Sequence, residues 1–259
     1  MRAGTAERRI SASGAARLGH PRTHPRTAPR RRTASDKMSI MSYWDPLPAV
    51  RAAESGPLTA PDGGTWLPAR EYRGDWWNTR PERWAERDWR NVPGPFYAAG
   101  TDSCWMGRLI APANVLYEDE WGGEFVYRQP RGRAQALALL GAVAQDPMAG
   151  YACDGDDHWT PQLVRDWWEE RGRVRDWAAA LDRKWSVSYR EDEREAAGGA
   201  REYVAYIDGG LAQDLRHYLF WLSEGRPANP GEPLPLLSPR GTWRGRGRNA
   251  HPLPRHRSP

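Results

Sequence analysis

The chain has 259 residues and a formal net charge of +5, but this charge is spread unevenly along the sequence. Residues 1–37 carry +8 and residues 225–259 carry +6, so residues 38–224 carry −9. An acidic domain repels polyanions. This excludes a nucleic-acid-binding domain in the middle of the chain and leaves only non-specific, salt-dependent binding through the basic ends.

Cysteine content and hydropathy exclude two further classes of protein. The only cysteines are Cys104 and Cys153, too few for a small secreted domain held by disulfides. No apolar run approaches the roughly 20 residues that span a bilayer, and the N-terminal segment lacks the apolar stretch of a signal peptide. We therefore expect a cytoplasmic protein without membrane contact.

The two basic ends lack the residues that build a core. Apart from Met1, Ile10 and Leu18 are the only large apolar residues of segment 1–37, and segment 225–259 is rich in proline and arginine. Such segments bury too little apolar surface to offset the entropy lost on ordering. We expect disordered tails at 1–37 and 225–259 around one globular domain at 38–224.

Short, mixed elements are expected in the first half of that domain. Asp45-Pro46 supplies an N-cap and a proline at the first helical position, so a short helix should run to about Gly56. An extended segment should follow at 65–72. Thr79 and Glu82 form a capping box that predicts a helix to about Trp89.

A β-hairpin is the next expected element. The β-forming tripeptides Val115-Leu116-Tyr117 and Phe125-Val126-Tyr127 flank a polar, glycine-rich turn. A third strand is expected over Cys104 to Ile110. The segment 96–129 therefore predicts a small antiparallel sheet.

Helices dominate the second half. An alanine- and leucine-rich stretch predicts a helix over 133–145, and Thr160-Pro161 predicts the start of a long one. Further helices are expected over 191–207 and over 211–222, with Gly225 as the C-cap of the last. The sequence thus predicts an α+β fold, with a small antiparallel sheet first and helices after it.

Tryptophan replaces phenylalanine as the main large apolar residue. The chain has 15 Trp and only three Phe. Most of these indoles are expected to fill the core, since aromatic residues at element spacing usually pack inward. The alternative is a stacking surface for a planar or cationic ligand, for which the candidate binding residues are Trp76, Trp77, Trp105 and Trp159.

The densest group of potential ligands is Asp154-Gly155-Asp156-Asp157-His158. Asp154, Asp156, Asp157 and His158 could bind a hard metal ion, although Trp159 and Arg165 stand where an EF-hand needs Gly and Glu. The alternative is a solvated turn before the helix at Thr160, where negative charge is favoured.

A thiol enzyme is a further possibility. Cys104 or Cys153 could pair with His158 as nucleophile and base, with Asp102 or another carboxylate orienting the imidazole. The catalytic candidates are therefore Cys104 and His158. A lone cysteine is, however, more often a small buried apolar residue.

Three segments resemble an uncharacterised actinobacterial, Streptomyces-like protein family. They are NVPGPFYAAGTDSCW (91–105), VYRQPR (126–131) and DPMAGYACDGDDHWTP (146–161). Some members of that family carry the label ferredoxin. Iron–sulfur clusters take four Cys, or two Cys with two His, and this chain offers two Cys and His158, which argues against a cluster.

No motif names a reaction, and no cofactor is predicted. The charge of −9 and the surplus of tryptophan favour a non-catalytic interaction or accessory protein with a protein partner. The alternatives are a metal-dependent or thiol enzyme that uses the Asp154–His158 cluster, and a small-ligand-binding protein with tryptophan platforms.

Overall fold

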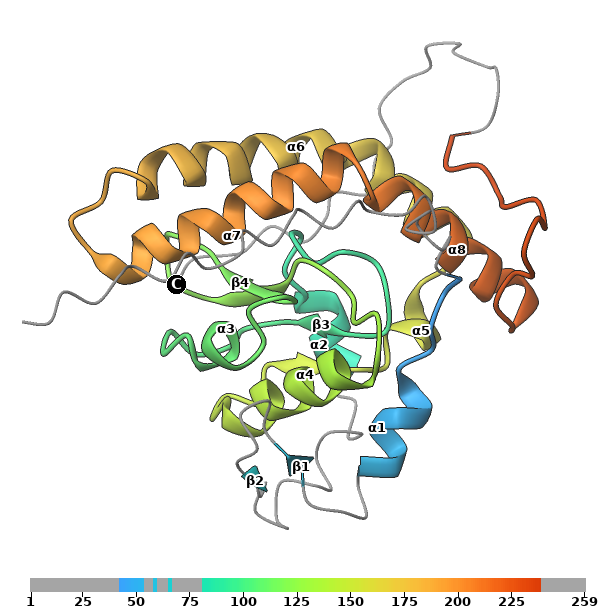
Figure 1. Ribbon diagram of the computed structural model, residues 1–259, viewed down its shortest axis with the longest axis horizontal. Coiled ribbons are helices and arrows are strands. Elements are labelled where there is room, and N and C mark those ends of the chain that lie inside the picture. The colour runs from blue at the N-terminus through green and yellow to red at the C-terminus, as the bar shows by residue number, and fades with distance from the viewer. Residues whose placement is uncertain (1–41, 54–57, 60–64, 67–80, 239–259) are drawn as a thin grey trace, which may run out of the picture. The chain divides into compact units, whose positions relative to one another are not determined.

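The computed structural model describes residues 42–53, 58–59, 65–66 and 81–238 (Figure 1). Its elements in chain order are α1 (Leu47–Ala53), β1 (Leu58–Thr59), β2 (Thr65–Trp66), α2 (Pro81–Glu86), β3 (Tyr97–Ala98), α3 (Met106–Ile110), β4 (Val115–Tyr117), β5 (Glu124–Val126), α4 (Arg133–Gln145), β6 (Tyr151–Ala152), α5 (Gly155–His158), α6 (Pro161–Trp185), α7 (Glu191–Asp208) and α8 (Leu211–Glu224). The fold is α+β, as the sequence predicted.

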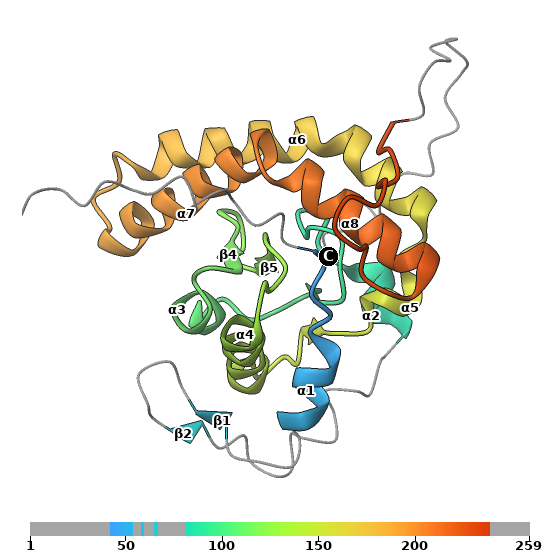
Figure 2. The ribbon, with the colours of Figure 1, turned by 45° about the vertical axis from the view of Figure 1, so that its right-hand side comes forward.

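The predicted hairpin separates two hydrophobic cores. Strands β4 and β5 are antiparallel, with Val115 opposite Val126 and Leu116 opposite Phe125. Successive side chains of a strand point to opposite faces. Leu116 and Phe125 accordingly join one core, while Val115 and Val126 join the other. In both Figure 1 and Figure 2, α6, α7 and α8 lie on one side of the hairpin and α4 lies on the other.

The larger core lies under the three long helices. Its apolar residues recur at helical spacing along α6 and α8, which is why these segments form amphipathic helices. They are Val164, Trp167, Val174, Ala178, Leu181 and Trp185 on α6, and Leu211, Leu215, Tyr218 and Leu219 on α8. The apolar face predicted for 211–222 is thereby confirmed, with Leu222 partly buried at its edge.

Local signals fix the ends of these helices as expected. The Thr160 hydroxyl accepts the Leu163 N–H at 3.2 Å, and Pro161 occupies the first helical position. At the far end of α8, Gly225 adopts a left-handed φ of 64°, a conformation that costs glycine little.

The smaller core lies between α1, α4 and the other face of the hairpin. It contains Val50 of α1, Leu139 and Leu140 of α4, and Phe96. At the start of α1, the Asp45 carboxylate accepts the Leu47 N–H at 2.9 Å, so the capping role predicted for Asp45 is confirmed.

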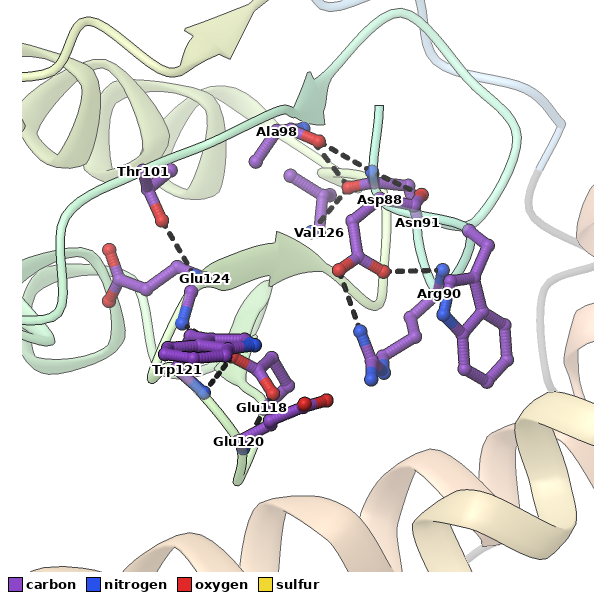
Figure 3. Close-up of polar contacts among 12 residues, drawn as sticks. Asp88, Arg90, Asn91, Ala98, Thr101, Glu118, Glu120, Trp121, Glu124 and Val126 are labelled. Atoms are coloured by element: carbon purple, nitrogen blue, oxygen red, sulfur yellow. Dashed lines mark hydrogen bonds and ion pairs between the residues drawn. The ribbon is translucent and has the colours of Figure 1, made fainter. Parts of the chain in front are cut away.

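Asn91 joins the loop before β3 to the hairpin (Figure 3). Its side chain is buried and makes four hydrogen bonds to backbone groups. The amide donates to the carbonyls of Asp88 and Ala98, and its oxygen accepts the N–H groups of Ala98 and Val126. One side-chain oxygen thus supplies the acceptor for two backbone N–H groups, which native proteins rarely leave buried without a partner.

Two sequence expectations need correction. The segment from Cys104 to Ile110 is not a strand, because Met106–Ile110 forms α3. Strand β3 instead pairs with β6, with Tyr97 opposite Ala152. The folded part also extends past 224: Arg216 donates to the carbonyls of Leu234 and Pro235, and Leu237 is buried in the larger core.

Among the helices that the structure describes, none is both long enough and apolar enough to span a membrane.

Candidate functional site

The side chains of the predicted metal cluster face different partners. His158 Nε2 lies 2.9 Å from Asp154 Oδ2, whereas Asp156 Oδ1 accepts the Tyr218 hydroxyl at 2.7 Å and Asp157 is exposed. Within the described ranges, no group of three or more His, Cys, Asp or Glu side chains is arranged to hold a metal ion.

His158 also belongs to an aromatic stack. Its ring stacks on the Trp84 indole, with the ring centroids 4.8 Å apart and an interplanar angle of 16°. The Arg87 guanidinium carbon lies 3.9 Å from the centroid of the Trp84 ring. Trp159 meets Trp84 edge-on. These contacts fix the His158 imidazole and pack α2 against α5.

The two cysteines lie in different settings. Cys104 is exposed, and the Asp102 carboxylate beside it raises the pKa of its thiol. That shift opposes the thiolate form that a nucleophile needs. Cys153 is buried in the smaller core, where a cysteine packs like a small apolar residue.

The tryptophan candidates divide between core, surface and undescribed segments. Trp76 and Trp77 lie outside the described residues. Trp159 is buried in the larger core, so core packing accounts for it. Trp105 is half-buried and lines a hollow of about 250 Å³ at the end of the β4–β5 hairpin.

That hollow combines aromatic rings with carboxylates, and we call it the acidic hollow. The residues that line it come from the β4–β5 turn, the segment before α3, the end of α6 and the start of α7. They are Ser103, Trp105, Tyr117, Glu118, Asp119, Glu120, Trp121, Gly122, Trp185, Arg190 and Glu193.

Trp105 forms one wall and holds an unusual conformation. Its φ is +58°, which is uncommon for a bulky residue. The ring stacks on Tyr117 at 4.6 Å with an interplanar angle of 12°, and the Arg190 guanidinium lies 5.0 Å from its centroid. No described residue accepts a hydrogen bond from its buried indole N–H. A Cβ on Gly122 would come within 2.9 Å of that nitrogen, so the close approach requires glycine.

The turn beside Trp105 is held by one buried carboxylate. Glu118 accepts the backbone N–H groups of Glu120 at 2.7 Å, Trp121 at 2.7 Å and Gly123 at 3.0 Å (Figure 3). Lys184, at the end of α6, donates to Asp119 at 2.6 Å. These contacts position the turn against the helices.

The lining carries more negative than positive charge. The Glu-Asp-Glu tripeptide at 118–120 contributes three lining residues, and a second such tripeptide at 191–193 contributes Glu193. The only cation among the lining residues is Arg190. Arg190 is itself paired with Asp192 at 2.5 Å. In the described part of the chain, the Glu120 carboxylate has no hydrogen-bond or ion-pair partner, so it adds uncompensated negative charge to the rim.

Large apolar side chains project into solvent on two loops beside the acidic hollow, the β4–β5 turn and the loop between α6 and α7. Trp121 of the β4–β5 turn is 73% exposed, and Val187 and Tyr189 of the α6–α7 loop are 85% and 93% exposed. That loop lies at the left end of the long helices in Figure 1. Aromatic residues are enriched at protein interfaces.

Sequence reasoning identified only part of this arrangement. Trp105 was a candidate ligand-binding residue, but Trp121 and the acidic tripeptide before it were interpreted only as a turn. The repeated Glu-Asp-Glu tripeptide was the available signal, yet nothing local indicates that the start of α7 lies beside the β4–β5 turn.

Comparison with known proteins gives no match: no family model, no curated protein and no solved structure matches this chain.

Proposed function

We propose that this protein is a non-catalytic binding protein that accepts a basic segment of a partner protein in the acidic hollow. The observation that carries the proposal is the exposure of Trp121, Val187 and Tyr189 on the two loops that border a negatively charged hollow. Trp and Tyr are the residues most enriched at the energetic centres of protein interfaces. We further propose that the protein acts in the cytoplasm.

The contact between Arg190 and Trp105 is an internal example of the recognition we propose. A guanidinium near an indole ring is stabilised by the ring's quadrupole. Carboxylates around the ring favour the same cation by direct charge attraction. An arginine of the partner could stack on Trp121 and face Glu120 in the same way, and arginine suits this role better than lysine because its group is planar.

The experiment measures peptide affinity on the full chain by isothermal titration calorimetry. Short peptides of equal length, arginine–glycine, lysine–glycine, serine–glycine and glutamate–glycine, are compared at low and moderate salt. We expect the arginine peptide to bind most tightly, with an affinity that falls as salt rises. Equal binding of the serine or glutamate peptide would contradict the proposal.

Two variants test whether the peptide binds at the acidic hollow. Trp121→Ala should weaken arginine-peptide binding by more than about tenfold, as expected for a central aromatic residue. Glu120→Gln should weaken it by up to about fivefold, because a rim charge contributes less.

Each variant has a matched control on α6. Leu163→Ala removes a partly exposed apolar side chain, and Glu170→Gln removes an exposed carboxylate. Glu170 is 15 residues before Trp185, which is roughly 22 Å along the helix. Both controls should bind the peptide as the unchanged protein does. Loss of binding in the controls but not in Trp121→Ala would reject the acidic hollow as the site.

A further inference from the structure

A second cavity, of about 60 Å³, lies away from the acidic hollow and shares no residue with it. Five parts of the chain meet around it: the segment before α1, the loops at 92–93 and 129–131, α7, and α8. The lining residues that matter here are Tyr43, Arg131, Tyr206, Asp214, His217 and Tyr218.

Two polar groups on this lining lack partners among the described residues. They are the Tyr43 hydroxyl and His217 Nδ1, both buried. His217 as a whole is only 6% exposed, and its other ring nitrogen lies 3.0 Å from the amide nitrogen of Gln213. Buried polar groups without a partner destabilise a fold, and native proteins rarely leave them so. An occupant of the cavity that hydrogen-bonds to both groups would remove this cost.

The charges at the cavity cancel. Arg131 donates to Asp214 at 2.5 Å, and the Tyr206 hydroxyl donates to the same carboxylate oxygen at 2.7 Å. Burial lowers the pKa of His217, more than the Asp214 carboxylate raises it, so the imidazole is neutral near pH 7. A charged molecule would lose its hydration without gaining an unpaired opposite charge. The cavity therefore favours an uncharged occupant.

Flat rings form the walls. Tyr43 lies 5.5 Å from the Tyr218 ring and 5.1 Å from the Trp221 ring, which fixes its orientation. Apolar residues such as Val92 and Leu215 complete the lining. A water molecule needs about 10–15 Å³ of such space, so the volume corresponds to a few water molecules and limits the occupant to a small molecule.

We infer that this cavity is a binding site for a small, uncharged, planar molecule that carries a hydroxyl or a carbonyl group. The polar group of the ligand hydrogen-bonds to the Tyr43 hydroxyl and to His217 Nδ1. Its ring lies against the tyrosine rings. This site is independent of the acidic hollow and does not depend on the function proposed there.

The test uses phenol as the probe, with benzene and benzoate as comparators. Binding to the full chain is measured by calorimetry, and the ring nitrogens of His217 are observed by NMR. Phenol should bind and shift the His217 Nδ1 signal. Benzene lacks the polar group and benzoate is charged, so each should bind at least about fivefold more weakly, the effect of one hydrogen bond.

Two variants remove the polar groups while keeping the walls. Tyr43→Phe deletes one hydroxyl, and His217→Phe removes the ring nitrogens while keeping a flat ring. Each should weaken phenol binding by about five- to tenfold, whereas Tyr189→Phe, which deletes an exposed hydroxyl elsewhere, should leave it unchanged. Thermal unfolding of each variant verifies that it is folded.

The alternative occupant is ordered water alone. In that case phenol would not bind up to its solubility limit, or it would bind equally well to Tyr43→Phe and His217→Phe, and the inference would be wrong. Trp121→Ala should leave phenol binding intact, which separates failure here from failure of the proposed function.

Discussion

Glu124 is a buried acid whose hydrogen bonds hold α3 beside the hairpin. Its carboxylate accepts the Arg108 N–H at 2.6 Å, the Gly107 N–H at 3.2 Å and the Tyr151 hydroxyl at 2.8 Å. Burial nevertheless dominates and raises its pKa to about 7. In the folded protein this acid therefore holds its proton in a pH range where the unfolded chain has already lost it.

The sign of the resulting pH dependence follows from proton binding. Between about pH 4.5 and pH 7 the folded state binds more protons than the unfolded state, so the free energy of unfolding falls as pH rises. A shift from 4.5 to about 7 corresponds to about 3 kcal/mol. Glu124→Gln removes this titration, and we expect the fall in stability between pH 4.5 and pH 8 to be smaller in the variant by about that amount.

Urea unfolding at several pH values measures the effect. The comparison between variant and unchanged protein is needed because burial also raises the pKa of Asp88, Asp146 and Asp156. Asp88 and Asp156 titrate in both proteins and cancel in the difference, whereas Asp146 interacts with Glu124 and cancels only in part. Glu170→Gln, which alters an exposed side chain, serves as the control. Identical pH profiles for Glu124→Gln and the unchanged protein would refute the role given to Glu124.

Such residues could not be identified from the sequence. Glu124 acts on α3 from 16 residues away, and Asn91 meets Val126 from 35 residues away. Glu118 was predictable only as a turn residue, although its carboxylate organises one side of the acidic hollow. The Asp154–His158 pair, by contrast, was predictable as a local cluster because the two residues are four positions apart, at the N-cap and the end of one short helix.

Elements with strong local signals were predicted well. The hairpin, α4 and the three long helices follow from β-forming tripeptides, helical periodicity and caps near their ends. The prediction of a strand over Cys104 to Ile110 was wrong. This segment forms the short helix α3, which depends on the Glu124 carboxylate of a later strand. The pairing of β3 with β6 was not predicted, because these strands lie more than 50 residues apart in the sequence.

Two adjacent glycines in α7 have opposite surroundings and give a prediction about that helix. A Cβ at Gly198 would meet nothing within 4 Å, whereas a Cβ at Gly199 would lie 3.0 Å from the Arg108 guanidinium and from Leu116. Alanine is favoured over glycine in a helix by about 0.5–1 kcal/mol. Gly198→Ala should therefore raise the free energy of unfolding by about that amount.

Gly199→Ala should not give this gain, because α7 approaches β4 closely there and overpacking costs about 1–3 kcal/mol. Urea unfolding of the two variants tests the contrast. Gly172, on α6, also faces open space, so Gly172→Ala is the control and should stabilise as Gly198→Ala does. Equal stabilisation by Gly198→Ala and Gly199→Ala would mean that α7 does not pack against β4 at this distance.

At the scale of the whole molecule, charge is separated along the chain. Residues 38–238 carry −9, while 1–37 and 239–259 carry +8 and +6. Opposite charges on one chain attract each other, and the attraction weakens as salt rises. We therefore predict that the basic ends weaken the binding of a basic partner to the acidic domain, and only these ends carry a surplus of positive charge for polyanions.

Removal of both basic ends tests this separation. The full chain should bind a random-sequence DNA duplex at low salt with an affinity that falls steeply as salt rises, measured by fluorescence anisotropy. A chain limited to residues 38–238 should lose this binding, because its net charge is negative. The same shortened chain should bind the arginine–glycine peptide at least as tightly as the full chain, since the internal competitor is gone. Persistent DNA binding would reveal a basic surface within 38–238, and weaker peptide binding would show that the ends contribute to the partner site instead of competing for it.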